Sequence, residues 1–254
     1  MLKKSILVGL TLALTAAITT SSVRAEDKGR VLFVLTSHDK LGDSGKKTGW
    51  YLEELSSPYY AIKDAGYKID IASPKGGTAP LDEESKKPED GANKRFLADK
   101  DAMKQINNTL ALSKVKAEDY KAIVFPGGHG PMFDLADNKD SQKLVQKIYE
   151  KKGVVAAVCH GPAGLVNVKL KDGSYLLKGK KVTGFTNAEE DAVNKTKYMP
   201  FMLESKMTEH GGKFEKSPLW QSHVTIDGNL ITGQNPKSAE GMGKEVVKQL
   251  ASSN

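Results

Sequence analysis

Four short runs of apolar residues are spaced along the chain and predict its strands. They are residues 30–37 (RVLFVLTS), 67–73 (YKIDIAS), 120–128 (YKAIVFPGG) and 153–159 (GVVAAVC). Nearly continuous apolar runs of this length are typical of strands in a parallel sheet, because helices cover both faces of such a sheet. The pattern therefore indicates an open, mostly parallel sheet.

Helical periodicity appears between and after these runs. Residues 140–153 carry an apolar face, and residues 238–252 predict a final amphipathic helix. The apolar face of the first of these segments consists of Leu144, Val145 and Ile148. Another helix is predicted to begin at Ser57 as N-cap, with Pro58 at its first helical position, and to end at Gly66.

Two further segments complete the fold prediction. Residues 223–233 predict two short strands around an Asp-Gly turn. Because strands alternate with helices, we expect one domain, a three-layer α/β sandwich of flavodoxin-like type with helices on both faces of the sheet. Residues 75–116 are highly charged and break this rhythm. We interpret them as a surface excursion that acts as a lid, or as a solvated loop without function.

The first 25 residues have the layout of a secretory signal peptide. Two lysines precede an apolar stretch, residues 6–18, which is too short to span a bilayer comfortably. Val-Arg-Ala at 23–25 matches a small-x-small cleavage site. We expect cleavage after Ala25, a domain of residues 26–254, and export to the periplasm or the medium without stable membrane insertion. The alternative is an uncleaved N-terminal anchor.

Charge and cysteine content narrow the function classes. The net charge of +7 falls to +4 without the signal peptide, which contains Lys3, Lys4 and Arg24 and no acid. The remaining lysines are scattered, and no basic stripe with interleaved aromatic residues appears, which excludes a nucleic-acid footprint. The single cysteine, Cys159, excludes an internal disulfide. In an exported chain a lone thiol is either a reactive group or an inert buried one.

Cys159 lies where a strand would turn sharply into a helix. This geometry, a nucleophile elbow, projects a side chain at the carboxyl edge of a sheet. Gly161 would permit the turn and Pro162 would open the helix, whose positive end would lower the thiol pKa. His160 is a candidate base or a hydrogen-bonded bystander. A buried structural cysteine is the alternative interpretation of the same pattern.

A second glycine-rich turn is predicted at the same sheet edge. PGGHG, residues 126–130, follows the third apolar run, and its glycines would let backbone N–H groups approach a ligand as an oxyanion hole. The other histidines show no metal-ligand spacing such as His-x-x-x-His, so no zinc site is expected. These histidines are His38, His129, His210 and His223.

Two of these motifs, AAVCHGPAGL and FPGGHG, resemble the ThiJ/PfpI superfamily, which is related to class I glutamine amidotransferase domains. Further segments resemble its branch of heat-shock chaperones with glyoxalase III activity, and together they cover nearly the whole mature chain. These segments are KTGWYLEELSSPYY (47–60), IASPKGG (71–77), GKKVTGFTNAEEDAV (179–193), PFMLE (200–204) and LITGQNP (230–236).

The resemblance implies roles that spacing alone does not. An acid just before the first helix meets the nucleophile in this family, and Glu54 matches that position, whereas neighbouring Glu53 fits a solvated acid better. A carboxyl in a desolvated pocket would hold its proton and shuttle protons beside the sulfur. Glu190 would orient the histidine, with Glu189 and Asp191 as alternatives.

The resemblance also implies an oxyanion hole and an activity. Gly128 and His160 would supply the oxyanion-hole N–H groups. Methylglyoxal would be converted to D-lactate through a hemithioacetal on Cys159, without any cofactor, metal or glutathione. The family relatives are mostly cytosolic, whereas this chain is expected to be exported, and homodimers are common among them.

Three other functions remain open. One is a deglycase or a peptidase-like hydrolase that uses the same nucleophile. Another is a holding chaperone for unfolded envelope proteins, with YMPFML (198–203) as an exposed patch, although core packing explains that segment equally. The third is an oxidation sensor built on Cys159.

Overall fold

The structure, a computed structural model, describes residues 28–86 and 91–252. The expected signal peptide, residues 1–25, lies outside the described residues. Within them, no helix is both long and apolar enough to cross a bilayer.

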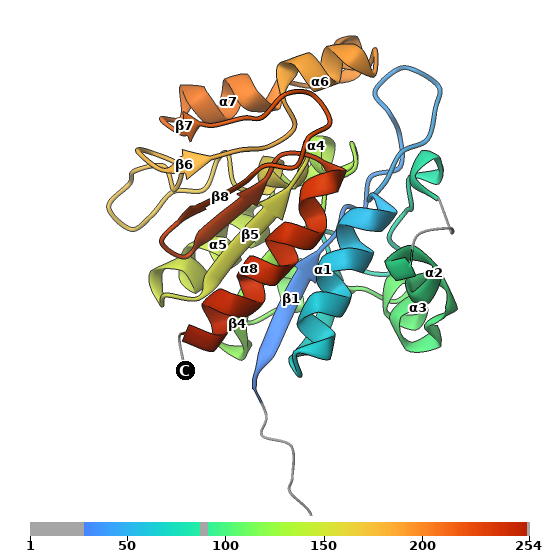
Figure 1. Cartoon of the computed structure of the whole chain (residues 1–254), viewed down its shortest axis with the longest axis vertical. Helices are drawn as coiled ribbons and strands as arrows, with labels where there is room; N and C mark the ends of the chain where they lie inside the picture. The colour runs from blue at the N-terminus through green and yellow to red at the C-terminus, as the bar shows by residue number, and fades with distance from the viewer. Residues whose placement is uncertain (1–27, 87–90, 253–254) are drawn as a thin grey trace, which may run out of the picture.

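A seven-stranded sheet forms the centre of the molecule (Figure 1). The strand order is β3-β2-β1-β4-β5-β9-β8, and all neighbours are parallel except β8 and β9, which form an antiparallel hairpin. The strands are β1 Arg30–Val34, β2 Lys68–Ser73, β3 Leu110–Ala111, β4 Tyr120–Phe125, β5 Val154–Val158, β8 Val224–Asp227 and β9 Leu230–Gly233. Every residue of β5 is buried, as expected for a strand covered on both faces. The four apolar runs and the Asp-Gly hairpin therefore form strands as predicted.

Helices cover both faces of this sheet. The α-helices are α1 Leu52–Asp64, α2 Gly91–Ala98, α3 Lys100–Asn107, α4 Pro131–Asp134, α5 Lys139–Glu150, α6 Asn187–Ala192, α7 Leu203–Glu209 and α8 Ala239–Ser252. Short 3₁₀ helices are η1 Glu83–Ser85, η2 Leu112–Lys114, η3 Ala117–Asp119, η4 Gly161–Gly164, η5 Thr196–Tyr198 and η6 Pro236–Ser238, and a second sheet pairs β6 Lys181–Val182 with β7 Lys213–Phe214.

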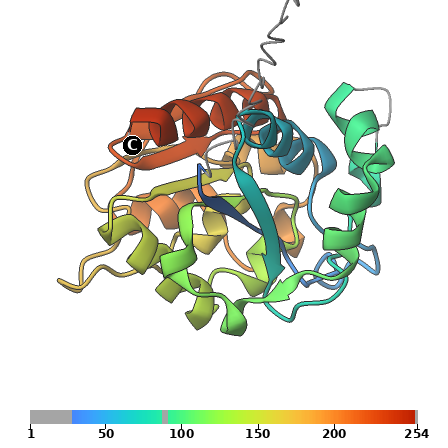
Figure 2. The same ribbon diagram turned by 90° about the horizontal axis from the view of Figure 1, so that it is seen from below.

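The layers match the predicted three-layer sandwich. Helices α1 and α8 pack together on one face, and α5 packs on the other against β4 and β5. Seen from below, the sheet lies between these two helical layers (Figure 2). Helices α6 and α7 extend over the carboxyl ends of the central strands (Figure 1). The predicted helices at 140–153 and 238–252 are confirmed as α5 and α8.

The predicted start of the first helix is wrong. Helix α1 begins at Leu52 rather than after Ser57, and Pro58 lies inside it. The N–H of Leu52 donates to the hydroxyl of Ser85, 33 residues away, at 3.0 Å. This contact gives a partner to one of the backbone N–H groups of the first turn that have none within the helix. No local sequence pattern indicates the contact.

The described parts of residues 75–116, which are 75–86 and 91–116, contain helices and a short strand and are not a solvated loop. Helix α2 packs against α1, and α3 packs against α2 and β2. Phe96 of α2 is fully buried between the rings of Trp50, Tyr59 and Tyr60. The same segment supplies Ser85 to the start of α1. This segment therefore supports α1, the helix that carries Glu54. Its charged sequence does not indicate this role.

The close packing of α1 and α8 can be tested with two glycines of α8. A Cβ on Gly243 would lie 2.7 Å from the Cα of Pro58, whereas a Cβ on Gly241 would meet only a side-chain methyl at 3.5 Å. We expect Gly243→Ala to reduce the free energy of unfolding by about 1–3 kcal/mol because it overpacks the interface. Gly241→Ala should raise it by up to about 1 kcal/mol through helix propensity. Urea unfolding of both variants measures the difference, and equal effects would contradict the close contact.

Candidate active site

The backbone of Cys159 adopts a left-handed conformation directly after β5. Its φ is +59°, which is uncommon for a residue other than glycine. Its N–H donates to the carbonyl of Gly233 at 2.9 Å, and its carbonyl accepts from the N–H of Phe185 at 2.8 Å. Hydrogen bonds on both sides thus hold the bend, and the predicted nucleophile elbow is present.

The segment after the elbow differs from the prediction. Pro162 lies in a 3₁₀ helix of four residues, η4, and not at the start of an α-helix. Gly161 is required because a Cβ there would lie 2.0 Å from the carbonyl oxygen of Phe125. A single 3₁₀ turn aligns few peptide dipoles, so the expected stabilisation of a thiolate by a helix end is wrong.

Cys159, His160 and Glu190 form a hydrogen-bonded chain. The Sγ of Cys159 lies 3.3 Å from Nδ1 of His160, and Nε2 of His160 lies 2.7 Å from Oε2 of Glu190. The two side chains of the second pair are 1% and 5% exposed. An ionised carboxylate only accepts hydrogen bonds, so Nε2 of His160 carries the proton and Nδ1 is free to accept one from the thiol.

A second histidine shares the same carboxylate. Nε2 of His129 lies 3.0 Å from Oε1 of Glu190, and the rings of His129 and His160 are 4.2 Å apart. Burial lowers the pKa of His129 to about 4, so it is neutral at pH 7. Burial opposes ionisation of Glu190, but the electrostatic interaction with His160 and the hydrogen bonds from both histidines hold its pKa well below the usual range.

The geometry distinguishes the three neighbouring acids that the sequence left as alternatives. Glu190 contacts His160, as the resemblance implied. Asp191 instead accepts from the hydroxyl of Thr196 on the surface. Glu189 is fully buried but bonds to a different set of groups. Only Glu190 can therefore orient the histidine.

Glu189 holds one wall of the site together. Its Oε2 accepts from the N–H and hydroxyl of Thr186, and its Oε1 accepts from the N–H of Trp220. The side-chain amides of Gln234 and Asn235 donate to the same Oε1 at 3.0 and 2.8 Å. Trp220 itself has a φ of +63°. The carboxylate thus fixes the strained turn that presents the indole to the pocket.

Glu54 approaches the nucleophile from α1. It is fully buried in the first turn of this helix, and not just before the helix as the resemblance implied. Its Oε2 accepts from the N–H of Gly127 at 2.7 Å. Its Oε1 has no well-aligned partner, yet the Cys159 thiol interacts with this carboxyl strongly enough to affect its pKa.

Burial sets the protonation states of this pair. Burial raises the pKa of Glu54 from 4.5 to about 8, so the carboxyl is protonated at neutral pH, as predicted. Burial and the nearby carboxyl also raise the pKa of the Cys159 thiol above its ordinary value. The predicted low thiol pKa is therefore wrong for the resting site. Ionisation of the sulfur requires proton transfer to His160.

The PGGHG turn meets the elbow as predicted, because β4 and β5 are adjacent and parallel. Gly128 has a φ of +85°, and a Cβ there would lie 2.3 Å from the carbonyl oxygen of Gly49. A Cβ on Gly127 would lie 2.5 Å from Glu54 and 2.7 Å from the backbone nitrogen of His160. These glycines let the backbone reach the sulfur, where the N–H of His160 lowers the thiol pKa.

A cavity of about 260 Å³ opens onto this cluster. An ion pair lies in its wall, with Nζ of Lys195 and Oε2 of Glu84 2.8 Å apart. The lining residues are Tyr51, Asp82, Glu84, Gly128, His129, Cys159, His160, Phe185, Val193, Lys195, Trp220 and Pro236. The cavity therefore combines a thiol, two imidazoles, aromatic walls and a charged side.

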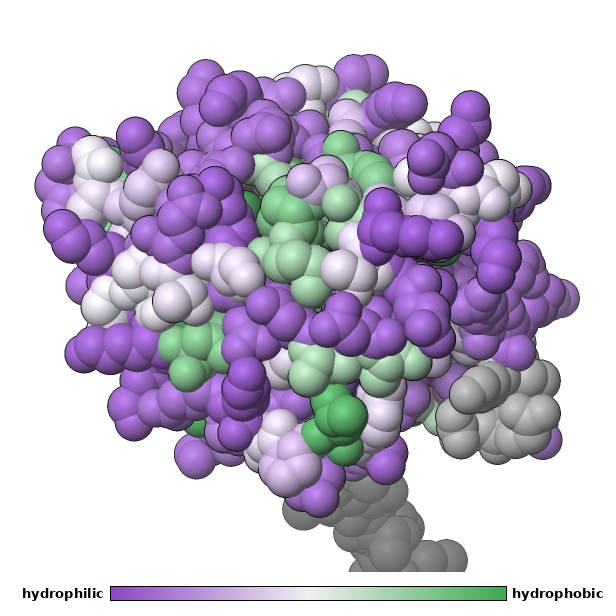
Figure 3. Space-filling model, turned by 90° about the horizontal axis from the view of Figure 1, so that it is seen from above, coloured by the Kyte–Doolittle hydropathy of each residue, from purple (hydrophilic) through white to green (hydrophobic). Residues whose placement is uncertain are grey.

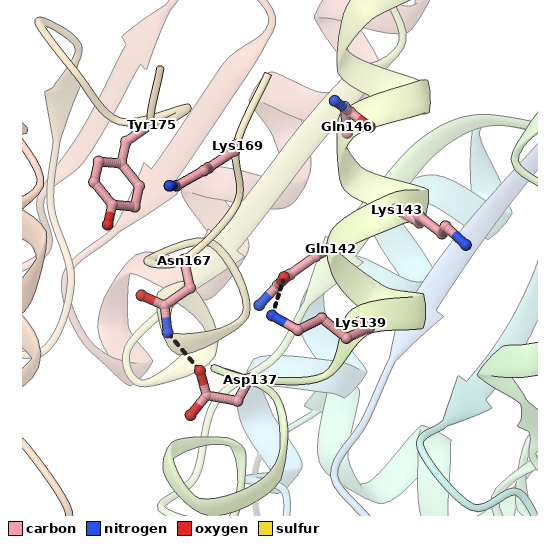
Figure 4. Close-up of a pocket in the computed structure, with 8 residues that line it drawn as sticks. All are labelled: Asp137, Lys139, Gln142, Lys143, Gln146, Asn167, Lys169 and Tyr175. Carbon is pink, nitrogen blue, oxygen red and sulfur yellow. Dashed lines mark hydrogen bonds between the residues drawn. The ribbon is translucent and has the colours of Figure 1, made fainter. Parts of the chain in front are cut away.

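A larger hollow of about 540 Å³ lies beside α5 (Figure 4). Amide and lysine side chains project into it, and Asn167 donates to Asp137 at 2.8 Å. Its described lining holds neither a thiol nor an imidazole. We therefore assign the chemistry to the smaller cavity at Cys159.

Sequence reasoning missed several residues of this cavity. The spacing of His129 indicates no metal site, and nothing local indicates its contact with Glu190, although it lies in the PGGHG motif at the correct sheet edge. Asp82, Lys195 and Trp220 come from segments whose place in the fold no local pattern indicates. The structure also brings His129, His160 and Glu190 together, with one ligand atom of each within 4.8 Å of the others. Local spacing cannot reveal such a group.

Comparison with known proteins agrees with this geometry. The DJ-1/PfpI family model matches residues 48–249. The chain belongs to the DJ-1/PfpI family. It is 34% identical to "Glyoxalase 3" of Candida albicans over 229 residues, 86% of this chain and 97% of that protein. It is 36% identical to "Glutathione-independent glyoxalase HSP31" of Saccharomyces cerevisiae over 238 residues, 87% of this chain and 98% of that protein.

Solved structures of DJ-1/PfpI proteins share the whole fold. The Rapid Encystment Protein 24 KDa of Francisella tularensis superposes with a TM-score of 0.85 and 44% identity, over 87% of this chain and 99% of that one. Glyoxalase III of Candida albicans superposes with a TM-score of 0.79 and 31% identity, over 87% and 97%. The predicted superfamily and fold are thus confirmed.

The raised pKa of Glu54 has a consequence for stability. Between pH 4.5 and about 8 the Glu54 carboxyl is protonated in the folded chain but ionised in the unfolded chain. The contribution of Glu54 to the free energy of unfolding should therefore fall with rising pH, by at most about 1.4 kcal/mol per pH unit. Glu54→Gln, which mimics the neutral acid, should become more stable relative to wild type as pH rises from 5 to 8. Urea unfolding measures this difference, and a constant difference would contradict the raised pKa.

Proposed function

We propose that this protein is a glutathione-independent glyoxalase that converts methylglyoxal to D-lactate. The observation that carries the proposal is that Cys159 and His160 line one small cavity, with Glu190 bonded to His160 and the buried acid Glu54 interacting with the thiol. Relatives that match nearly their full length bear the name glutathione-independent glyoxalase. Their name and this geometry support the same reaction.

The first step forms a bond between sulfur and the aldehyde carbon. Nδ1 of His160 takes the thiol proton as Sγ attacks, and the aldehyde oxygen takes the proton of the neutral Glu54 carboxyl to give a hemithioacetal. Glu54 is left as a carboxylate. Glu190 stabilises the imidazolium that forms. The backbone N–H groups of Gly128 and His160 are the proposed donors to the oxygen while it carries negative charge.

The second step moves a proton between the two carbons. Glu54, as a carboxylate, removes the proton from the former aldehyde carbon while the His160 imidazolium gives its proton to the ketone oxygen, which yields an enediol. Glu54 then returns its proton to the neighbouring carbon, and His160 takes the proton of the hydroxyl on the sulfur-bearing carbon. The product is a thioester of lactate, which water hydrolyses to lactate and the free thiol. A pKa of about 8 suits Glu54 to this task, because both of its forms are accessible near neutral pH.

The size and enclosure of the cavity favour a small aldehyde over a polypeptide. Cys159 is 3% exposed, and the cavity is smaller than the roughly 300–1,000 Å³ of sites for drug-sized ligands. The paired Lys195 and Glu84 form part of its wall. The deglycase and peptidase interpretations need a larger substrate to reach the sulfur, so the glyoxalase reaction is favoured.

The holding-chaperone interpretation receives no support from residues 198–203. Met199 and Phe201 pack against the core, and Leu203 is 3% exposed. Seen from above, the surface is mostly polar, with separate small apolar areas (Figure 3). The large exposed apolar side chains among the described residues are Leu110, Leu219, Trp220 and Ile226. Leu110 and Ile226 lie on opposite edge strands, so these side chains do not form one patch.

Substitutions in the site test the reaction. We expect Cys159→Ser to abolish lactate formation from methylglyoxal without glutathione, because the nucleophile is lost. Glu54→Gln should lower kcat by about 100-fold or more, since it cannot take a proton from carbon. Glu53→Gln is the matched control and should keep most activity. An enzymatic assay for D-lactate measures all three, and equal losses in the Glu53 and Glu54 variants would contradict the role of Glu54.

We also propose that the chain is exported and works as a homodimer outside the cytosol. The signal-peptide pattern of residues 1–25 supports export, and the family resemblance supports the dimer. We expect the protein isolated from the periplasm or medium of its host to begin at Glu26, and its molar mass in solution to be twice that of one chain. N-terminal sequencing and light scattering measure these, and an intact N-terminus in the cytosolic fraction would contradict export.

A further inference from the structure

Two imidazoles in the wall of the cavity converge on one buried carboxylate behind them. Nε2 of His129 and Nε2 of His160 approach the two oxygens of Glu190 at 3.0 and 2.7 Å. One ligand atom of each residue lies within 4.8 Å of the others, and all three residues are buried. His129 and His160 also line the cavity, so a small ion can reach them from solvent.

These donors and their spacing suit a divalent zinc ion. Two imidazole nitrogens and one carboxylate oxygen form a common zinc ligand set, with a solvent molecule in the fourth position. Metal–ligand bonds of about 2.0–2.2 Å place tetrahedral ligands about 3.4 Å apart. Small side-chain rotations therefore bring the three groups around one ion.

The surroundings add negative charge. Asp82 and Glu84 line the same cavity, and Lys195 is paired with Glu84 at 2.8 Å. The carboxylates on this side outnumber the ammonium group, which favours entry of a cation. We propose that the His129–His160–Glu190 cluster binds Zn²⁺ reversibly and that the bound ion inhibits the enzyme.

Inhibition follows from the tautomer of His160. In the resting site Nε2 carries the proton and Nδ1 accepts from the thiol. An ion on Nε2 requires its lone pair, so the proton moves from Nε2 to Nδ1 of the same ring, and His129 undergoes the same shift. No proton is released, but Nδ1 of His160 can no longer accept the thiol proton. The nucleophile then stays protonated.

Enzyme assays with added Zn²⁺ test the inhibitory role, which depends on the proposed glyoxalase activity. Each variant is compared with its own rate in a metal chelator. We expect His129→Asn to need at least about tenfold more Zn²⁺ than wild type for half inhibition. His38→Asn is the matched control, because His38 lies outside the cluster and bonds to the carbonyl of Lys40. Equal inhibition of wild type and His129→Asn would overturn the proposal.

Binding measurements test the site without turnover. Cys159→Ser removes the thiol as a competing ligand, and we expect calorimetry to find one Zn²⁺ per chain in this variant and none in Cys159→Ser/His129→Asn. Co²⁺ in Cys159→Ser should give the visible absorption of tetrahedral nitrogen and oxygen ligation. Failure of Cys159→Ser to bind either ion would overturn the site. Binding by a protein that makes no lactate would overturn the proposed function and leave the metal site standing.

Discussion

The left-handed bend at Cys159 is the constraint on which the site depends. A residue with a side chain is strained at this φ by about 1–3 kcal/mol, and the surrounding structure must hold it there. Two hydrogen bonds hold the bend: the N–H of Cys159 donates to the carbonyl of Gly233, and the carbonyl of Cys159 accepts from the N–H of Phe185. The bend turns the sulfur out of the sheet layer toward His160. Without it, the residue would continue the buried face of β5.

The two buried acids of the site have opposite protonation states because their hydrogen-bond partners differ. Glu54 has one backbone donor and no fixed positive charge beside it, so desolvation dominates and keeps it neutral. Glu190 is nearly as buried, but two histidines donate to it and hold it ionised. One acid can therefore exchange protons with substrate, while the other orients the imidazole.

The same atoms serve the proton relay and the proposed zinc site. Glu190 accepts from His160 in the relay, and the ion would replace the protons on both Nε2 atoms. His129 is not needed to activate the thiol, yet it completes the ligand set. A second histidine on one carboxylate thus stabilises the resting site and makes it sensitive to a metal that the reaction does not use.

The sequence alone determined that the two reactive loops lie at the same edge of the sheet. One apolar run is followed by the glycine-rich turn and another by Cys159, and parallel strands end at the same edge. It also indicated the family, and through it Glu54 and Glu190. Only tertiary structure decided where α1 begins, since Ser85 caps it from 33 residues away. Tertiary structure also decided the raised thiol pKa and the partnership of His129, because burial and long-range contacts leave no local pattern.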